Sequence, residues 1–282
     1  MKRYQRGVAL LSVLLVMSLA LLLTAGMLRS HQLLVQSSAR QVHQVQLVQL
    51  ALSAQEWASI VLQSLDDEQQ RVHLAQPWAH IRWPFAIDGA QISLHIEDLS
   101  GRFNINTLLG AGPVDPLARQ RWTRLLGSLG LDAVDLPATG NVRELSQLRG
   151  LAGIDAEFLR TLEPWVAALP REATLNINTA PAQVLAMLEG VSMATAEALV
   201  NQRPEDGYAS VQAFTHGPLV AGAGLNSQGL GVGSRWFRVY VDVSLGNSRL
   251  RLASEVERER KTGRWRVVQR RLLPPTSSES FL

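Results

Sequence analysis

The sequence contains no cysteine, so disulfide bonds and thiolate metal sites are excluded. Its six histidines are scattered, and none of them forms a pair with the spacing of a metal site. Three motifs of common enzymes are also missing: the Gly-Lys-Ser/Thr of phosphate-binding loops, the Gly-x-Ser-x-Gly of many hydrolases and the His-Glu-x-x-His of zinc proteases. These absences favour a protein that is not an enzyme.

The chain has little net charge, and all of it lies at one end. Lys2, Arg3 and Arg6 account for the formal charge of +3, because without them the 27 basic residues fall to the number of acidic residues, 24. Nucleic acids and anionic surfaces attract proteins with a basic excess. The balanced remainder of the chain gives no support to a nucleic-acid partner.

Proline and glycine are scarce in the first quarter of the chain. No proline occurs before Pro77, and Gly26 is the only glycine between Gly7 and that proline. Apolar residues recur there at steps of three and four, as in an amphipathic helix: Leu33, Leu34, Val42, Val45, Val48, Leu52, Trp57, Ile60, Val61 and Leu65. The pattern predicts one helix over residues 8–65, ended by Asp66-Asp67-Glu68. A membrane anchor followed by a separate soluble helix is the alternative.

Charged residues are absent from residues 8–28, which precede Arg29. Twenty-one helical residues span about 31 Å, enough to cross a bilayer core. The basic leader, residues 1–7, should stay in the cytoplasm and direct residues 29–65 to the other side. A secretory signal has a small residue after a shorter apolar run, whereas here Gly7 comes before a full-length run.

The segment Arg6-Gly7-Val8-Ala9-Leu10-Leu11 resembles the type III signal of type IV pilin-like proteins. The resemblance implies a cell inner membrane protein with most of its chain in the periplasm. It also implies that a prepilin peptidase cleaves between Gly7 and Val8 and methylates the new terminus at Val8. A plain signal anchor is the alternative for this segment alone.

The fifth residue after the cleavage point is Ser12. Most pilin-like proteins have a glutamate there, which is thought to pair with the terminal amine of the next subunit toward the tip. A carboxylate in the membrane is expensive without such a partner. An apolar or small polar residue at this position is a feature of the K-type minor pseudopilin of type II secretion, the subunit at the filament tip.

Alternating patterns predict strands in two separated parts of the chain. Residues 79–85 and 91–97 form the first part, and residues 236–245, 250–256 and 265–272 the second. In the first part His95 falls on the polar side. The stretch that follows resembles the Asp-x-x-Gly-Arg-Phe-Asn-x-Asn segment of the K-type pseudopilins, here Asp98, Gly101, Arg102, Phe103, Asn104 and Asn106. We interpret it as a structural turn with a local ion pair.

Helical patterns fill the region between the two groups of strands. The predicted helices are residues 115–129, 141–149, 155–168, 181–188 and 193–202. A second stretch resembles a helix-hairpin-helix and the K-type family motif: Asn176, Asn178, Thr179, Ala180 and Pro181, with Thr179 predicted as a helix N-cap. The K-type pseudopilins have two such helical, SAM-like pieces inserted in the pseudopilin fold.

The helix-hairpin-helix also allows a different function, that of a membrane-anchored DNA-uptake receptor. DNA-binding versions offer backbone amides to a phosphate from a Gly-x-Gly hairpin. In this chain Ser192 stands in place of the second glycine, Glu189 adds negative charge, and residues 181–202 contain no lysine or arginine. Because phosphate binding normally draws on basic groups, we interpret the segment as a packing module.

Residues 203–235 are rich in glycine and predict a loop, in which Glu205 and Asp206 are the only acidic residues. So few carboxylates do not make a self-contained calcium site. The resemblance gives calcium a precedent among K-type relatives, but the sequence does not place its ligands, and no cofactor is assigned.

The resemblance therefore implies an α+β pseudopilin fold, a long N-terminal helix on an antiparallel sheet with a large inserted helical domain. The expected organisation is a leader (1–7), a membrane-spanning part (8–28), a periplasmic helix (29–65), sheet and loops (66–106 and 203–273), the insert (107–202) and a tail (274–282). The expected role is a minor pseudopilin at the tip, which joins I-type and J-type minor pseudopilins and supports assembly and protein export.

We predict that the mature protein begins at Val8. Mass spectrometry of the protein extracted from membranes should find an N-methylated Val8 and no peptide from residues 1–7. A terminus at Met1, or one beyond Gly26, would exclude processing of the pilin type.

Overall fold

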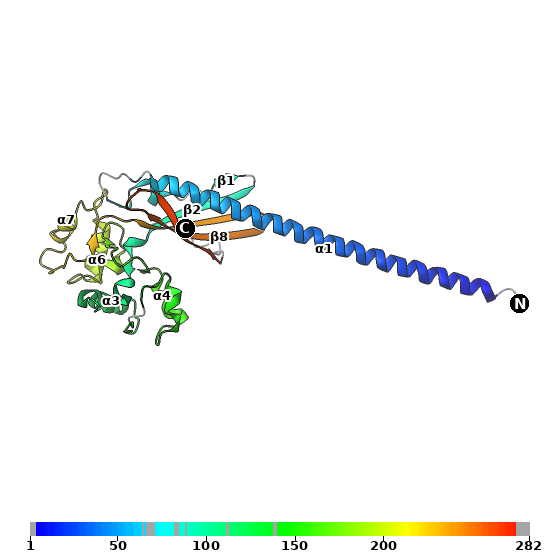
Figure 1. The fold of residues 1–282 in the computed structure, drawn as a ribbon, viewed down its shortest axis with the longest axis horizontal. Coiled ribbons are helices and arrows are strands. Elements are labelled where there is room, and N and C mark those ends of the chain that lie inside the picture. Colours follow the sequence, from blue (N-terminus) through cyan, green and yellow to red (C-terminus); the bar gives the residue numbers. More distant parts are fainter. Residues whose placement is uncertain are drawn as a thin grey trace.

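The structure is a computed structural model that describes residues 4–63, 65, 71–81, 85–87, 89–110, 113–137 and 140–274. One long helix projects from a compact head, and the N-terminus lies at the far end of that helix (Figure 1). The head consists of a sheet beside the end of the helix and a group of short helices beyond the sheet.

Helix α1 (Tyr4–Gln63) is a single helix of 60 residues. The alternative of an anchor and a separate helix is therefore wrong. The helix begins four residues before the predicted start at residue 8, because Gly7 disfavours a helix by only about 1 kcal/mol and does not interrupt it. The predicted end at Asp66-Asp67-Glu68 lies outside the described residues.

The sheet has five antiparallel strands in the order β1-β2-β7-β8-β9. They are β1 (Phe85–Ile87), β2 (Ala90–Asp98), β7 (Trp236–Leu245), β8 (Ser248–Arg258) and β9 (Trp265–Leu273). Strands β2 and β7 pair directly, so the two groups of predicted strands form one sheet. The predicted strand at residues 79–85 is largely wrong, because Pro77 starts a 3-10 helix, η1 (Pro77–His80), in which Trp78 is buried.

One face of the sheet packs against the last part of α1. The apolar residues of β2, β7 and β8 alternate as predicted and meet the helix in one core, which includes Leu47, Ala51, Ala58, Leu62, Leu94, Ile96, Val239 and Val241. Gln55 is fully buried in this interface, where its Oε1 accepts hydrogen bonds from Ser254 Oγ and Arg270 Nε, both at 2.7 Å. These bonds fix the register of the helix on the sheet.

The chain between β2 and β7 has its own apolar core. Its helices are α2 (Asn106–Leu109), α3 (Pro116–Ser128), α4 (Ala156–Leu162), α5 (Ala182–Leu185), α6 (Met193–Asn201) and α7 (Val211–Thr215), with 3-10 helices η2 (Leu99–Gly101) and η3 (Leu145–Gly150). Short parallel pairs join β3 (Phe103–Asn104) to β4 (Val166–Ala167) and β5 (Leu175–Asn176) to β6 (Leu230–Gly231).

Several predicted elements of this insert need correction. The helix expected at residues 155–168 ends at Leu162, because Pro164 follows, and the helix expected at 141–149 is the 3-10 helix η3. The loop expected at residues 203–235 contains α7 and β6, and Phe214, Val220 and Leu230 belong to the core of the insert. The packed region therefore continues past residue 202.

Asp98 joins the sheet to the insert. It ends β2 and is 5% exposed. Its Oδ1 accepts the Ser100 N–H at 2.8 Å, and its Oδ2 accepts Asn176 Nδ2 at 2.8 Å and the Thr179 hydroxyl at 2.7 Å. Burial raises the pKa of Asp98, and the hydrogen bonds that oppose this rise do not cancel it.

We predict that ionisation of Asp98 lowers the stability of the fold as the pH rises. A carboxyl group with a raised pKa in the folded state stabilises that state while protonated, and the stabilisation is lost as pH rises from about 3.9 through the folded pKa. Asp98→Asn should cost about 1–3 kcal/mol at acidic pH, because its amide meets the donor Asn176 Nδ2. The difference in the free energy of unfolding between Asp98→Asn and the wild type should become smaller as the pH rises.

The measurement is urea unfolding of the full chain in detergent at a series of pH values. Asp135→Asn, at an exposed aspartate, is the control and should follow the wild type throughout. A gap between wild type and Asp98→Asn that widens with rising pH would show that the buried carboxyl stabilises the fold in its charged form, contrary to this prediction.

Candidate functional site

The residues of the first predicted motif lie at the junction of sheet and insert. Arg102 forms its ion pair with Glu97, not with Asp98, and its Nη1 donates to the Glu163 carbonyl at 2.7 Å. The turn between Glu97 and Arg102 needs a glycine at position 101, because a Cβ there would lie 2.8 Å from Thr179 Oγ1. The motif therefore brings β2 close to the second motif.

Phe103, Asn104 and Asn106 extend the junction into the insert. The ring of Phe103 stacks on Trp122 with centroids 5.6 Å apart. The Asn104 amide accepts the Leu169 N–H at 3.1 Å and donates to the Pro170 carbonyl at 2.8 Å. Asn106 similarly bonds the backbone of Val142 and Leu169. Both buried side-chain amides form hydrogen bonds with loop backbone groups that have no partner in a β-ladder.

The second motif meets the first from the other side. Asn176 Nδ2 donates to Asp98 and, at 3.0 Å, to the Val72 carbonyl, while Asn178 holds the Tyr208 backbone. Thr179 bonds Asp98 and is not a helix cap; the N-cap of α5 is Pro181, without a side-chain hydrogen bond. Ala180 is fully buried, and its carbonyl accepts Arg203 Nη2. The structure thus brings Asp98 and Gly101 of the first motif together with Asn176 and Thr179 of the second, while Phe103 and Ala180 belong to the apolar core of the insert.

The hairpin contacts the rest of the insert, although Gly190 and Ser192 remain exposed. The hairpin lies between α5 and α6, and a Cβ on Gly190 would come within 2.4 Å of the Ala223 carbonyl oxygen. The Ser192 hydroxyl accepts the Thr195 N–H, so it caps α6. Glu189 forms an ion pair with Arg121 at 3.0 Å. The Glu189 carboxylate and the Ala223 carbonyl oxygen near Gly190 are unfavourable neighbours for a phosphate, and the packing role stays a prediction.

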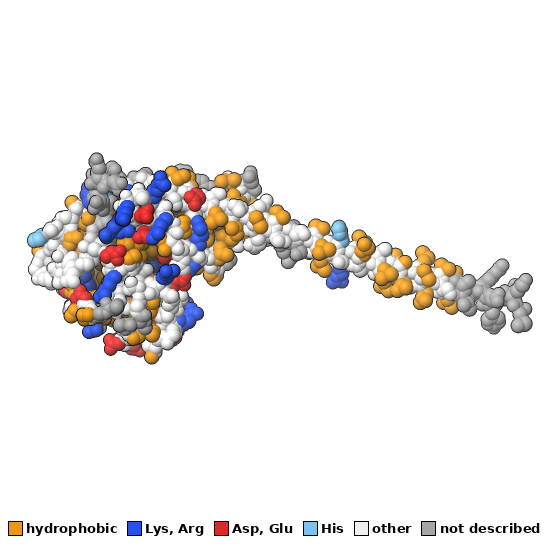
Figure 2. All heavy atoms as spheres, viewed as in Figure 1, with side chains coloured by type: hydrophobic (Ala, Val, Ile, Leu, Met, Phe, Trp, Pro, Cys, Tyr) orange, Lys and Arg blue, Asp and Glu red, His pale blue; other side chains and the backbone are white. Residues whose placement is uncertain are grey.

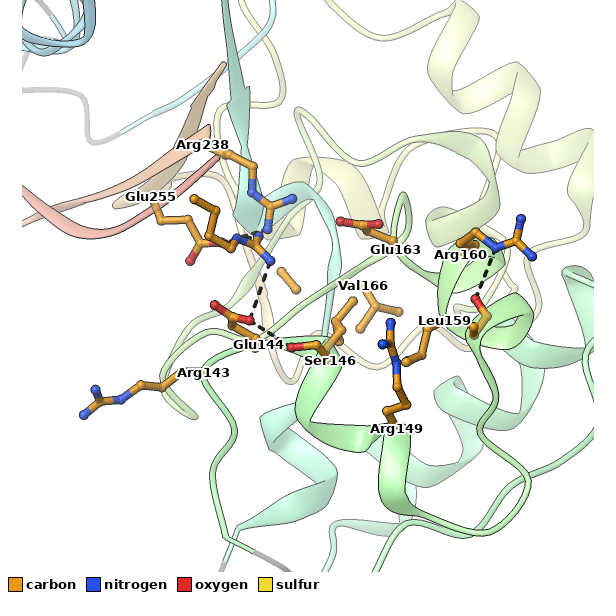
Figure 3. Close-up of a pocket in the computed structure, with 15 residues that line it drawn as sticks. Arg143, Glu144, Ser146, Arg149, Leu159, Arg160, Glu163, Val166, Arg238 and Glu255 are labelled. Carbon is orange, nitrogen blue, oxygen red and sulfur yellow. Dashed lines mark hydrogen bonds and ion pairs between the residues drawn. The ribbon is translucent and has the colours of Figure 1, made fainter. Parts of the chain in front are cut away.

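A cleft of about 200 Å³ separates the insert from strands β7–β9 (Figure 3). Arg238 pairs with Glu255 at 2.8 Å, and Arg271 lies 3.4 Å from Glu255 and 3.9 Å from Glu144. Ser146 donates to Glu144 at 2.8 Å. Arg238 and Glu255 therefore join β7 to β8, and Glu144, at the start of η3, pairs with Arg271 of β9.

Metal binding finds little support in the described part of the chain. Within it, no group of three or more His, Asp or Glu side chains is placed to hold an ion. Calcium, for which the sequence offered only a family precedent, is therefore given no ligands and no role here.

Helix α1 carries the largest apolar surface that the head leaves uncovered. Leu10–Val35 is long and apolar enough to cross a membrane, and it continues seven residues past the expected end at residue 28. After it, Val42, Val45 and Ile60 are 55%, 58% and 61% exposed. Ser12 lies within the apolar part of the helix and is also exposed. Gly7 and Val8 lie in the helix, but their side-chain surroundings are outside the described residues.

Sequence reasoning missed two groups of interacting residues. Arg121 and Glu189 were not expected to meet, and no sequence pattern placed Gln55 in the core between α1 and the sheet. The partners of Gln55 are about two hundred residues away in sequence, so local patterns contain no signal for them. A signal for the first pair existed: Arg121 recurs four residues before Leu125 on the apolar side of α3, where an unpaired charge is unfavourable.

The comparisons with known proteins agree with one another. A family model described as "Type II secretion system (T2SS), protein K" matches residues 175–233. Protein K of the type II secretion system of Pseudomonas aeruginosa is 34% identical over 96% of this chain and 93% of its own length. The protein K of Klebsiella pneumoniae is 30% identical, over 96% of this chain and 97% of its own.

A solved structure has the same fold. The crystal structure of the GspK-GspI-GspJ complex from the type 2 secretion system of enterotoxigenic Escherichia coli contains a chain that superposes with a TM-score of 0.71. That chain is 24% identical, and the match covers 85% of this chain and all of that one. Because similarity reaches from the N-terminal helix through the insert to the last strands, this chain belongs to the type II secretion system protein K family and is a minor pseudopilin.

Proposed function

We propose that this chain is a non-enzymatic subunit at the tip of the pseudopilus, where it caps the filament and joins I-type and J-type minor pseudopilins. The observation that carries the proposal is the uncovered apolar surface of α1. The first residue of α1 that the head buries is Leu47, so the helix before it projects without a cover from the described residues. Figure 2 shows apolar side chains along this projecting part and mixed charges on the head.

Two environments suit the two parts of this surface. Leu10–Val35 contains a single charged residue, Arg29, and fits the core of the inner membrane. Val42, Val45 and Val48 follow it outside the expected membrane part, where exposed apolar side chains need a protein partner. We define these three valines as the valine stripe. Its pattern suits the helices of other pilin-like subunits, which pack through similar apolar spacing.

The related crystal structure supports the choice of partners, because its title names a complex with GspI and GspJ. The leader supports a third partner, a prepilin peptidase that cleaves between Gly7 and Val8. Before assembly the protein would stay in the inner membrane as a single-pass protein with its head in the periplasm, and assembly would transfer α1 from lipid to the neighbouring helices.

Two features support a position at the tip. The insert lies beyond the sheet, at the end of the molecule opposite the N-terminus, where a bulky domain leaves little room for a further subunit (Figure 1). Ser12 replaces the glutamate that would need an amine from a subunit above it.

We predict that a charge in the valine stripe disrupts assembly without unfolding the head. Val45→Glu should weaken co-purification with the I-type and J-type pseudopilins at least about tenfold, because the interface would bury an unpaired carboxylate. Its thermal unfolding should match the wild type, since Val45 is 58% exposed. Gln46→Glu, which adds the same charge at the next exposed position, is the matched control. Equal effects of the two variants would argue against the stripe as the interface.

We further predict that Ser12→Glu brings no gain in assembly. At the tip no amine lies above residue 12, so the new carboxylate would cost about 2.5–3.5 kcal/mol in the membrane, or less when protonated. Ser12→Ala should behave as the wild type. Secretion and co-purification of the minor pseudopilins are the measurements. Better assembly of Ser12→Glu would mean that another subunit stands above this one, while the family assignment would be unaffected.

A further inference from the structure

Strand β9 forms one edge of the sheet, and α1 leaves part of its helix-facing side uncovered. Leu272 of β9 pairs with Leu252 of β8, so the two side chains point to the same face of the sheet. Leu252 is 5% exposed in the core beneath α1, whereas Leu272 is 68% exposed. The cover that α1 gives to the sheet therefore ends between β8 and this part of β9.

A row of side chains on α1 leads to the same edge. Four residues at steps of three, four and three lie on one side of the helix: Val45, Val48, Leu52 and Gln55. The first two belong to the valine stripe, and Leu52 is partly buried at the border of the core. Gln55 Oε1 accepts a hydrogen bond from Arg270 Nε at 2.7 Å, so the row meets β9 at this point. The valine stripe therefore continues onto the head along the side of α1 that adjoins β9.

The sheet leaves room for a second helix beside α1. Helix α1 packs mainly on β7, with β2 and β8 on either side. Neighbouring strands lie about 4.8 Å apart, so β9 is about 10 Å from β7. The axes of packed helices are about 8–10 Å apart. A helix packed against the row on α1 would therefore lie over β9 and cover Leu272.

Arg270 gives this edge an exposed positive charge. Among the described residues, its guanidinium donates to Gln55 and has no carboxylate within ion-pair distance. Glu56, the only acidic residue of α1, is contacted instead by Gln55 Nε2 at 3.4 Å. The remaining guanidinium donors suit a carboxylate on a partner, because they form a fixed fork that both oxygens of a carboxylate can accept.

We infer that one partner pseudopilin docks its N-terminal helix on this surface, which we define as the β9 flank: Val48, Leu52, Arg270 and Leu272. The partner helix places apolar residues over Leu272 and a carboxylate against Arg270. The inference rests on the proposed function, in which the I-type and J-type pseudopilins bind along α1, and it assigns one of their helices to one side of α1 and to β9. Because the β9 flank is continuous with the valine stripe, a single partner helix covers both surfaces.

The absence of cysteine from the chain permits a direct test. Leu272→Cys introduces one thiol, whose reaction with a maleimide is followed in the free full-length chain in detergent and in the complex with the I-type and J-type pseudopilins. The thiol should react at least about tenfold more slowly in the complex, because the core of an interface excludes water. Ile87→Cys, at a 48% exposed residue of the opposite edge strand, is the matched control and should react at the same rate in both.

Two substitutions test the chemistry of the β9 flank. Leu272→Glu should weaken co-purification of one partner at least about tenfold and leave the thermal midpoint unchanged, since Leu272 is 68% exposed. Arg270→Gln keeps a donor for Gln55 but removes the charge, so binding of the same partner should weaken about tenfold at low salt and depend less on salt. Arg249→Gln, at an exposed arginine on the other face of β8, should match the wild type.

Equal reaction rates of Leu272→Cys in the free chain and in the complex would overturn the inference, and so would undiminished binding of both partners by Leu272→Glu. The proposed function would survive both results if Val45→Glu still disrupts the complex. It fails instead, together with this inference, if neither pseudopilin co-purifies with the wild type.

The same thiol separates two other occupants of the β9 flank. A second copy of this chain would protect the thiol of Leu272→Cys in the chain alone, and more so at higher concentration. Residues 275–282, which follow the strand and lie outside the described residues, would protect it in the chain alone until they are removed. Slow reaction in the free chain, relieved by dilution or by truncation after Pro274, would therefore contradict the docking of a partner helix.

Discussion

A carboxyl group that leaves water must find its hydrogen-bond partners inside the protein, and Asp98 finds them in segments distant in sequence. Its bond to Asn176 spans 78 residues, and its bond to Thr179 spans 81. A buried polar group left without partners destabilises a fold by more than one such bond stabilises it. The conformation at the end of strand β2 therefore depends on β5 and on the turn that follows it. The sheet and the insert depend on each other through this contact.

The rest of the junction follows the same chemistry. The two large apolar cores have no member in common, and a small third cluster, in which Trp236 of β7 packs with residues of the insert, joins the two bodies. Directional bonds across the junction add to this contact: Asp98 to Asn176 and Thr179, Arg102 to Glu97 and the Glu163 carbonyl, and Glu144 to Arg271. Hydrogen bonds specify geometry more sharply than apolar contacts do. A polar junction therefore suits an insert that must stand in one orientation on the sheet.

Much of this fold was predictable because it depends on periodicity. The absence of proline before Pro77 predicted α1, and alternating patterns predicted strands at β2, β7, β8 and β9. Short elements were harder, since their form depends on distant partners. Threonine is a common N-cap residue, yet the Thr179 hydroxyl donates a hydrogen bond to Asp98. The segment at 203–235 reads as loop, yet Phe214 enters the core and Gly231 pairs with Asn176.

The candidate site was likewise predictable only in part. Motif resemblance placed Asp98 and Asn176 in the family pattern, but only the structure shows that they bond to each other. The position of Arg121 on the apolar side of α3 indicates that it needs a partner, but its partner Glu189 lies 68 residues away and no local pattern identifies it.

The different use of apolar and polar contacts also indicates which surface of the subunit is available for assembly. Several charges of the head are paired with one another, such as Arg238 with Glu255 and Arg251 with Asp242. Charges that are already paired within the head add little affinity for a partner. The projecting part of α1 has the opposite character, because its valines are apolar, exposed and without cover from the head. The apolar surface that favours association therefore lies along α1. Hydrogen bonds from Ser254 and Arg270 to Gln55 hold that helix in one position on the sheet. A subunit held in this way presents its insert at a fixed place relative to the helices that bind it.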